Sequence, residues 1–155
     1  MAELVTWCTS RLAIYKWFQI VLSMIAVLFL IDGRFQWKAY TFIFVACIVL
    51  ACITFLTLVL YFFRVPSDNK QLPWVQIEIA FNTVAVIVCL ITSGVLIYDL
   101  VNMAQGHHGH HRYTAPANIG NDGWFYRVIV VLCTQIVNTV AYLASLARAK
   151  RYGLK

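Results

Sequence analysis

Four long runs of apolar residues, separated by short polar segments, make up most of this chain. About 20 apolar residues in an α-helix are enough to cross the hydrocarbon core of a bilayer, which is about 30 Å thick. Each run reaches that length, so the pattern predicts transmembrane helices at residues 12–31, 39–63, 74–97 and 124–147. Because consecutive spans alternate in direction, we expect an all-α, antiparallel four-helix transmembrane bundle that forms one domain over residues 1–155.

The composition strengthens the prediction of a membrane protein. Of the 155 residues, 62% are hydrophobic and only 12% are charged, whereas soluble domains have about 25% charged residues. A soluble helical protein could bury one such run in its core, but not four runs joined by short loops. The first run is too long for the apolar region of a signal peptide, and segment 31–34 is a poor cleavage site, so we expect a retained helix.

The basic residues predict the orientation of the spans. The formal net charge is +6, but the basic side chains flank helix ends and form no groove-sized patch, which argues against a nucleic-acid partner. Short loops rich in Lys and Arg stay on the cytoplasmic side of a membrane. One predicted side carries Arg11, Lys16, Arg64, Lys70, Arg148, Lys150, Arg151 and Lys155, and the other carries Arg34, Lys38, Arg112 and Arg127. We therefore expect both termini and the central loop, 65–73, in the cytoplasm.

Polar residues inside the spans predict how the helices associate. Lipid is as apolar as a leucine side chain, so hydrogen bonds and small residues hold transmembrane helices together. Four polar residues lie at similar predicted depths, and Gln135 shares a face of the last helix with one of them. The pattern predicts one polar layer in the cytoplasmic half of the bundle, formed by Ser23, Thr54, Asn82, Gln135 and Asn138.

Two ionisable residues also fall within the predicted spans. Charged groups inside a membrane are costly and often functional. Lys16 in the first span and Glu78 in the third lie at matching depths, so we expect them to form an ion pair. A pair about one turn deep fits a structural role near the interface, and a proton or ion relay is the alternative.

The longest predicted loop, 98–123, contains four histidines, at His107, His108, His110 and His111. Imidazole groups bind Zn²⁺ and Cu²⁺ and change charge in mildly acidic compartments. A structural zinc site, however, places four ligands on a defined scaffold, and this loop is rich in turn-forming residues. A solvated loop without a cofactor is therefore the main expectation, and a metal-binding or pH-sensing loop on the outer face is the alternative.

Residues that flank the first two spans add two further expectations. Cys8 lies a few residues before the first span, which is a position typical of palmitoylation, although unmodified cysteines are also common there. Trp37 and Tyr40 lie where an aromatic belt contacts the membrane interface, so we expect both at the lipid boundary.

The sequence contains no pattern that indicates catalysis. Nucleophile elbows, phosphate-binding glycine loops and paired metal-binding histidines on a helix are absent, so an enzyme is not expected. A small channel or transporter would need a continuous polar path. Segments 24–30 and 42–49 in the predicted outer half are apolar apart from Cys47, which argues against such a path.

Three segments resemble the MARVEL-domain family, which includes MAL, plasmolipin and the chemokine-like-factor-like proteins. Segment 41–64 is similar to the family's second helix, with Phe, Val, Cys and Ala near its start and Leu-Tyr-Phe near its end. Segment 72–82 is similar to the junction that leads into the third helix, where Glu78 follows a tryptophan. The last span, with Tyr142-Leu143 and the basic residues after it, is similar to the fourth helix.

This resemblance implies a membrane-organising protein. Members of the family organise membrane microdomains, vesicle trafficking or cell junctions and are not expected to catalyse reactions. The implied partners are membrane lipids, other transmembrane proteins and further copies of the chain. The implied location is the plasma membrane or secretory and endosomal vesicles. The histidine-rich loop departs from the family pattern, and the predicted first outer loop, 32–38, is too short for the competing claudin-like architecture.

Overall fold

The computed structural model describes residues 11–63, 65–69, 71–107 and 115–152. These residues form helices and turns and contain no β-strand. The helices are α2 (Arg11–Leu30), α3 (Lys38–Phe62), α4 (Val65–Asp68), α5 (Trp74–Ala104) and α6 (Gly120–Tyr152). The all-α fold with four long helices is therefore confirmed.

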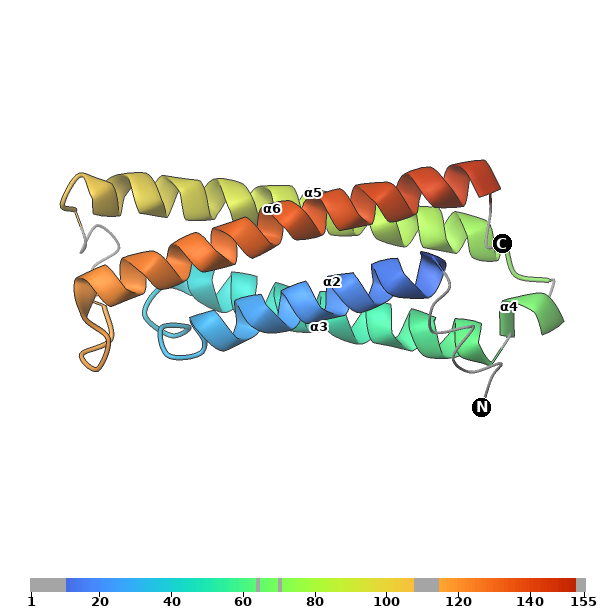
Figure 1. Ribbon diagram of the computed structural model, residues 1–155, viewed down its shortest axis with the longest axis horizontal. Coiled ribbons are helices and arrows are strands. Elements are labelled where there is room, and N and C mark those ends of the chain that lie inside the picture. The colour runs from blue at the N-terminus through green and yellow to red at the C-terminus, as the bar shows by residue number, and fades with distance from the viewer. Residues whose placement is uncertain (1–10, 64, 70, 108–114, 153–155) are drawn as a thin grey trace.

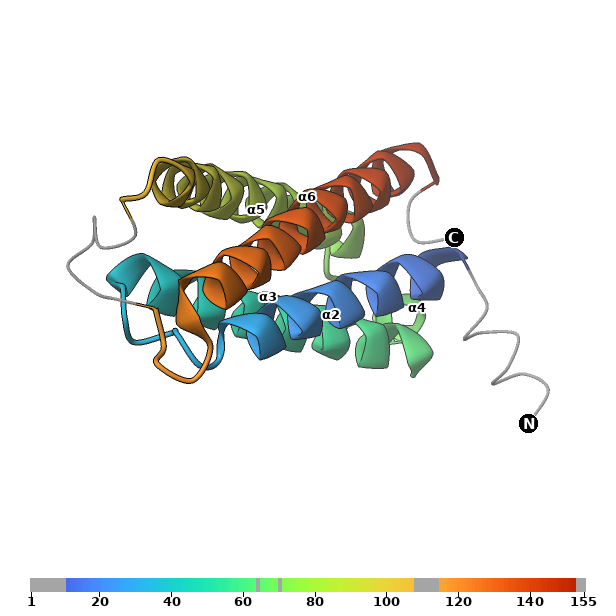
Figure 2. The same ribbon diagram turned by 60° about the vertical axis from the view of Figure 1, so that its left-hand side comes forward.

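The four long helices lie alongside one another as an elongated bundle (Figure 1). We call one end the α4 end, because α4 lies there together with the start of α2 and the end of α6. We call the opposite end the Gly33 end, after the residue in the loop between α2 and α3. α6 packs against both α2 and α5, and α2 packs against α3, whereas α3 and α5 touch each other at few points (Figure 2). α6 therefore joins the α2–α3 pair to α5.

All four long helices are long and apolar enough to cross a membrane, over Ala13–Leu30, Lys38–Phe62, Trp74–Ala104 and Gly120–Arg151. Most of each span faces outward, and many of the exposed side chains are large and apolar, including Phe18, Leu28, Phe42, Leu56, Leu90 and Val140. Many of the buried side chains are polar. This distribution suits a bundle surrounded by lipid, where an apolar exterior needs no water and interior polar groups bind one another.

Two helices are longer than the apolar runs that predict them. α5 continues past residue 97 to Ala104, and α6 begins at Gly120 instead of 124 and continues past 147 to Tyr152. The helical spacing of buried residues continues beyond the end of the apolar run, because Leu96, Asp99 and Met103 extend the buried face of α5. The predicted loop 98–123 is therefore shortened from both sides. Part of the predicted central loop also forms the short helix α4.

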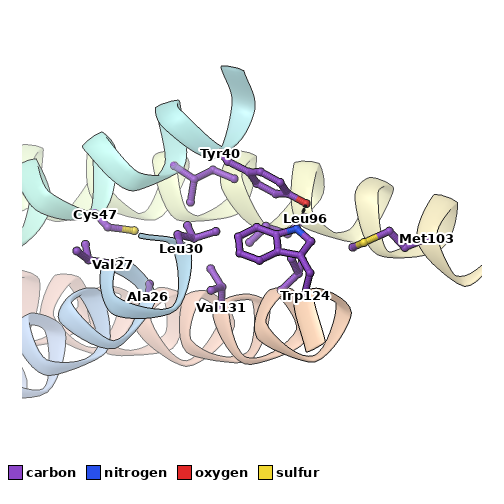
Figure 3. Packing of buried hydrophobic residues seen from close by; sticks show 11 residues of the cluster. Ala26, Val27, Leu30, Tyr40, Cys47, Leu96, Met103, Trp124 and Val131 are labelled. Atoms are coloured by element: carbon purple, nitrogen blue, oxygen red, sulfur yellow. Dashed lines mark hydrogen bonds between the residues drawn. The ribbon is translucent and has the colours of Figure 1, made fainter. Parts of the chain in front are cut away.

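Buried apolar side chains gather in two clusters along the bundle. The larger one lies toward the Gly33 end and includes Trp124 at the start of α6 (Figure 3). Within it, all four long helices contribute to a group that we call the apolar layer, formed by Val27, Leu30, Ile43, Leu96 and Val131. The smaller cluster contains Leu50, Ala85, Cys89 and Tyr142. The apolar layer separates two groups of polar residues, which are described next.

Candidate functional site

Lys16 of α2 and Glu78 of α5 lie together inside the bundle near the α4 end. Lys16 Nζ is 2.5 Å from Glu78 Oε1, and the two side chains are only 1% and 4% exposed. α2 and α5 both begin at the α4 end, and Lys16 and Glu78 each lie just over one turn from the start of their helix. The two residues therefore reach the same depth. The structure thus brings together the two residues that were predicted to pair.

Two further side chains bind the Glu78 carboxylate. The Tyr61 hydroxyl of α3 donates a hydrogen bond of 2.6 Å to Glu78 Oε2. Asn82 Nδ2 donates to Glu78 Oε1 at 2.7 Å and to the Glu78 main-chain carbonyl at 2.7 Å. Buried charges are tolerated when they are paired and hydrogen-bonded, and both carboxylate oxygens are satisfied here. We call Lys16, Tyr61, Glu78 and Asn82 the lysine cluster; it joins α2, α3 and α5.

The five residues that were predicted to form one polar layer are all buried, namely Ser23, Thr54, Asn82, Gln135 and Asn138. They do not share one network. Asn138 Nδ2 donates to Ser23 Oγ at 3.1 Å and so links α6 to α2. Thr54 Oγ1 of α3 lies 3.0 Å from the Tyr142 hydroxyl of α6, and Asn82 belongs to the lysine cluster. The interior thus holds separate interhelical pairs at several depths.

The remaining pairs also involve α6. Gln135 Nε2 donates to Cys47 Sγ of α3 at 2.9 Å. Gln19 Nε2 of α2 donates to Ser145 Oγ at 2.8 Å and to the Ala141 carbonyl at 3.2 Å. α6 therefore forms side-chain hydrogen bonds to both helices of the α2–α3 pair, which is how polar groups hold helices together in lipid.

A second polar group lies beyond the apolar layer, at the Gly33 end. The Tyr40 hydroxyl at the start of α3 donates to Asp99 Oδ2 of α5. The same hydroxyl accepts from Trp124 Nε1 of α6 at 3.1 Å (Figure 3). The Tyr40 and Trp124 rings pack edge to face, with centroids 5.3 Å apart. All three side chains are buried. Tyr40 therefore does not lie at the lipid boundary, as the sequence analysis expected, but points into the bundle.

Gly33 receives the Trp124 ring. A Cβ atom at this position would lie 2.2 Å from Trp124 Cη2, so only glycine leaves room for the indole. Next to it, Arg127 Nη1 of α6 lies 2.5 Å from Asp32 Oδ2, in a half-exposed ion pair. We call Gly33, Tyr40, Asp99 and Trp124 the tryptophan cluster. Together these residues fasten the start of α6 to the loop between α2 and α3.

Sequence reasoning did not identify Asp99 as an interior residue. The apolar run ends at residue 97, and Asp99 was therefore placed in a loop. A signal was present, because buried positions of α5 recur every three or four residues from Glu78 through Leu96 to Met103. Following this periodicity past the end of the apolar run would have placed Asp99 on the same inward face.

The residues proposed for metal binding and acylation fall mostly outside the described part of the chain. His108, His110, His111 and Cys8 lie outside the described residues, and His107 is exposed three residues after the end of α5. Among the described residues, no group of three or more His, Cys, Asp or Glu side chains could hold a metal ion.

The comparisons with known proteins give no relative: no family model, curated protein or solved structure matches the chain. The two polar clusters are therefore the features from which a function can be argued. The Glu78 carboxylate binds Lys16 of α2 and Tyr61 of α3, and the Asp99 carboxylate binds Tyr40 of α3, so both clusters connect neighbouring helices.

Proposed function

We propose that this chain is a multi-pass integral membrane protein that acts in the plane of the membrane as a structural and sorting component. In this proposal it catalyses no reaction. It contributes to membrane microdomains, vesicle trafficking or cell junctions through contacts of its outer surface with lipids and partner helices. The observation that carries the proposal is the division between an apolar outer surface and an interior whose polar groups bind one another.

The proposed orientation places the α4 end and both termini in the cytoplasm. Its support is the excess of basic residues in the segments at that end, including Lys150 and Arg151, which are exposed near the end of α6. The Gly33 end and the histidine-rich loop would then face outward or into a vesicle lumen. Membership of the MARVEL-domain family remains part of the proposal, and its support is the resemblance of the three sequence segments.

The main alternative is a small channel or transporter. Buried ionisable residues near both ends, Glu78 and Asp99, are the observation in its favour. Between them lies the apolar layer, in which Leu30, Ile43 and Leu96 are fully buried. Large apolar side chains from all four long helices therefore interrupt a polar path in the described part of the bundle.

Proximity labelling in cells that produce the protein would test the proposal. A labelling enzyme fused to either terminus should mark cytoplasmic proteins and the cytoplasmic segments of neighbouring membrane proteins. Substitution of outward-facing Phe55 and Leu56 by alanine should change the set of neighbours, whereas the matched change of buried Leu58 should mainly lower stability. An unchanged set of neighbours for the outward-facing variant, or robust ion flux in reconstituted liposomes, would contradict lateral action.

A further inference from the structure

Two members of the lysine cluster, Lys16 and Asn82, and the nearby Gln19 have hydrogen-bonding capacity that the described residues leave unused. Gln19 Oε1 and Asn82 Oδ1 are buried and accept no hydrogen bond from the described residues. Lys16 Nζ carries three N–H groups, but it contacts one carboxylate oxygen and lies 5.1 Å from the centroid of the Phe81 ring. Two acceptors and at least one donor are therefore unsatisfied in the same part of the interior.

The two amide groups cannot remove this deficit by turning over. Gln19 Nε2 donates to the main-chain carbonyl of Ala141, and Asn82 Nδ2 donates to the main-chain carbonyl of Glu78. A carbonyl accepts but does not donate, so exchanging the nitrogen and oxygen of either amide would break an existing hydrogen bond. Both side-chain oxygens are therefore fixed as acceptors.

Helix geometry places these groups at neighbouring depths on the inward faces of α2 and α5. Gln19 follows Lys16 by three residues on α2, and Asn82 follows Glu78 by four residues on α5, so each lies one turn further along the same face. Because the ion pair fixes the register of α2 and α5, the two amides lie at similar depth, about 4.5–6 Å further into the bundle than the pair.

We propose that Lys16, Gln19 and Asn82 form a binding site for one buried water molecule between α2 and α5. The water oxygen accepts a hydrogen bond from Lys16 Nζ, and its two hydrogens bind Gln19 Oε1 and Asn82 Oδ1. Buried waters make about three hydrogen bonds to polar groups that would otherwise be unsatisfied, which is the number available here. A metal cation is a poor occupant, because the ammonium group of Lys16 would repel it.

The water exchanges through the α4 end of the bundle. Toward the Gly33 end, the large side chains of the apolar layer block the interior. Toward the α4 end, the outermost member of the lysine cluster on α3 is Tyr61, which is half-buried and is the next-to-last residue of that helix. The site therefore lies on the α4 side of the apolar layer, which closes the interior toward the Gly33 end.

Transfer of magnetisation from water to side-chain amides, measured by solid-state NMR on the ¹⁵N-labelled protein in lipid bilayers, tests this proposal. We expect rapid transfer to the Gln19 and Asn82 amides. Gln135 is the dry reference, because its buried amide donates to Cys47 Sγ. Asn102 is the wet reference, because it is half-exposed and makes the same bond as Asn82 to the carbonyl four residues earlier. Transfer to Gln19 and Asn82 as slow as that to Gln135 would overturn the proposal.

A variant tests the geometry of the site. Asn82→Leu removes one of its three partners, so transfer to the Gln19 amide should fall several-fold toward the value at Gln135. Unchanged transfer at Gln19 would show that the water is not held as proposed. Asn102→Leu is the matched control and should leave Gln19 unaffected. If Asn82→Leu does not fold, the comparison of amides within the wild-type protein still decides the question.

Discussion

Replacement of Glu78 by leucine should destabilise the bundle more than any other single change in the lysine cluster. The substitution leaves the Lys16 ammonium 1% exposed and without its carboxylate, and it removes the acceptor used by Tyr61 and Asn82. Removing one partner of a buried ion pair costs about 3–5 kcal/mol, because the other charge stays buried. An average interhelical hydrogen bond in a membrane contributes only about 0.6 kcal/mol, so the two effects are distinguishable.

Replacement of Lys16 should cost less stability than replacement of Glu78. The double substitution should cost less than the two single losses added together. Lys16→Met leaves a carboxylate that still accepts from Tyr61 and Asn82, so we expect a loss of about 2–3 kcal/mol, in the range of hydrogen bonds to charged groups. In Lys16→Met/Glu78→Leu no charge is buried alone. We therefore expect the double variant to be more stable, by at least about 2 kcal/mol, than the two single losses together predict. This difference is within the range of coupling for residues in contact.

Reversible unfolding in mixed micelles, followed by circular dichroism as the denaturing detergent fraction rises, would measure these free energies. Thr83→Val is the matched control on α5, because Thr83 is exposed and bonds only to its own helix at Ile79 O. A cycle that is additive to within about 0.5 kcal/mol would refute the reasoning, since it would mean that neither charge depends on the other.

Two substitutions and one titration test the Gly33 end and the histidine-rich loop. Gly33→Ala should cost about 1–3 kcal/mol in the same assay, because the new Cβ would overlap the Trp124 ring; Gly94→Ala, with no atom within 4 Å of the added Cβ, should be neutral or stabilising. Tyr40→Phe should cost about 1–3 kcal/mol by removing the hydroxyl between Asp99 and Trp124, and equal loss in the exposed control Tyr126→Phe would contradict this. Calorimetric zinc titration of the intact protein should show affinity no tighter than that of a free loop peptide; tighter binding would instead support a metal site.

The sequence predicted the helices well because their hydrophobic runs are long. It predicted the ends of the helices less well where a helix continues beyond its apolar run. α5 continues to Ala104 because its buried face, with Leu96, Asp99 and Met103, persists past residue 97. An unbroken apolar run ends before Asp99, because such a run treats a polar residue as outside the span whichever face of the helix it occupies. Asp99 and its bond to Tyr40 were missed for that reason.

Depth along a helix can be counted from sequence, but rotation about its axis relative to distant helices cannot. Counting residues from the helix ends predicted the same depth for Lys16 and Glu78, and the structure places the two in contact. It did not show that Asn138 faces Ser23 while Gln135 faces Cys47, because neighbouring positions of α6 point toward different helices. Tyr40 shows the same limit, since its position near a helix end fits either the lipid boundary or the interior.

The central place of α6 has a consequence for biosynthesis. α6 is the last of the four long helices to leave the ribosome, yet it joins α5 to the α2–α3 hairpin. Until it is inserted, the Gln19 and Ser23 side chains of α2 lack their α6 partners, and Gly33 lacks the indole that covers it. A nascent chain of three helices therefore presents unpaired polar groups to lipid or to membrane chaperones. Arrival of the last helix completes assembly, and a chain truncated before it should be retained and degraded.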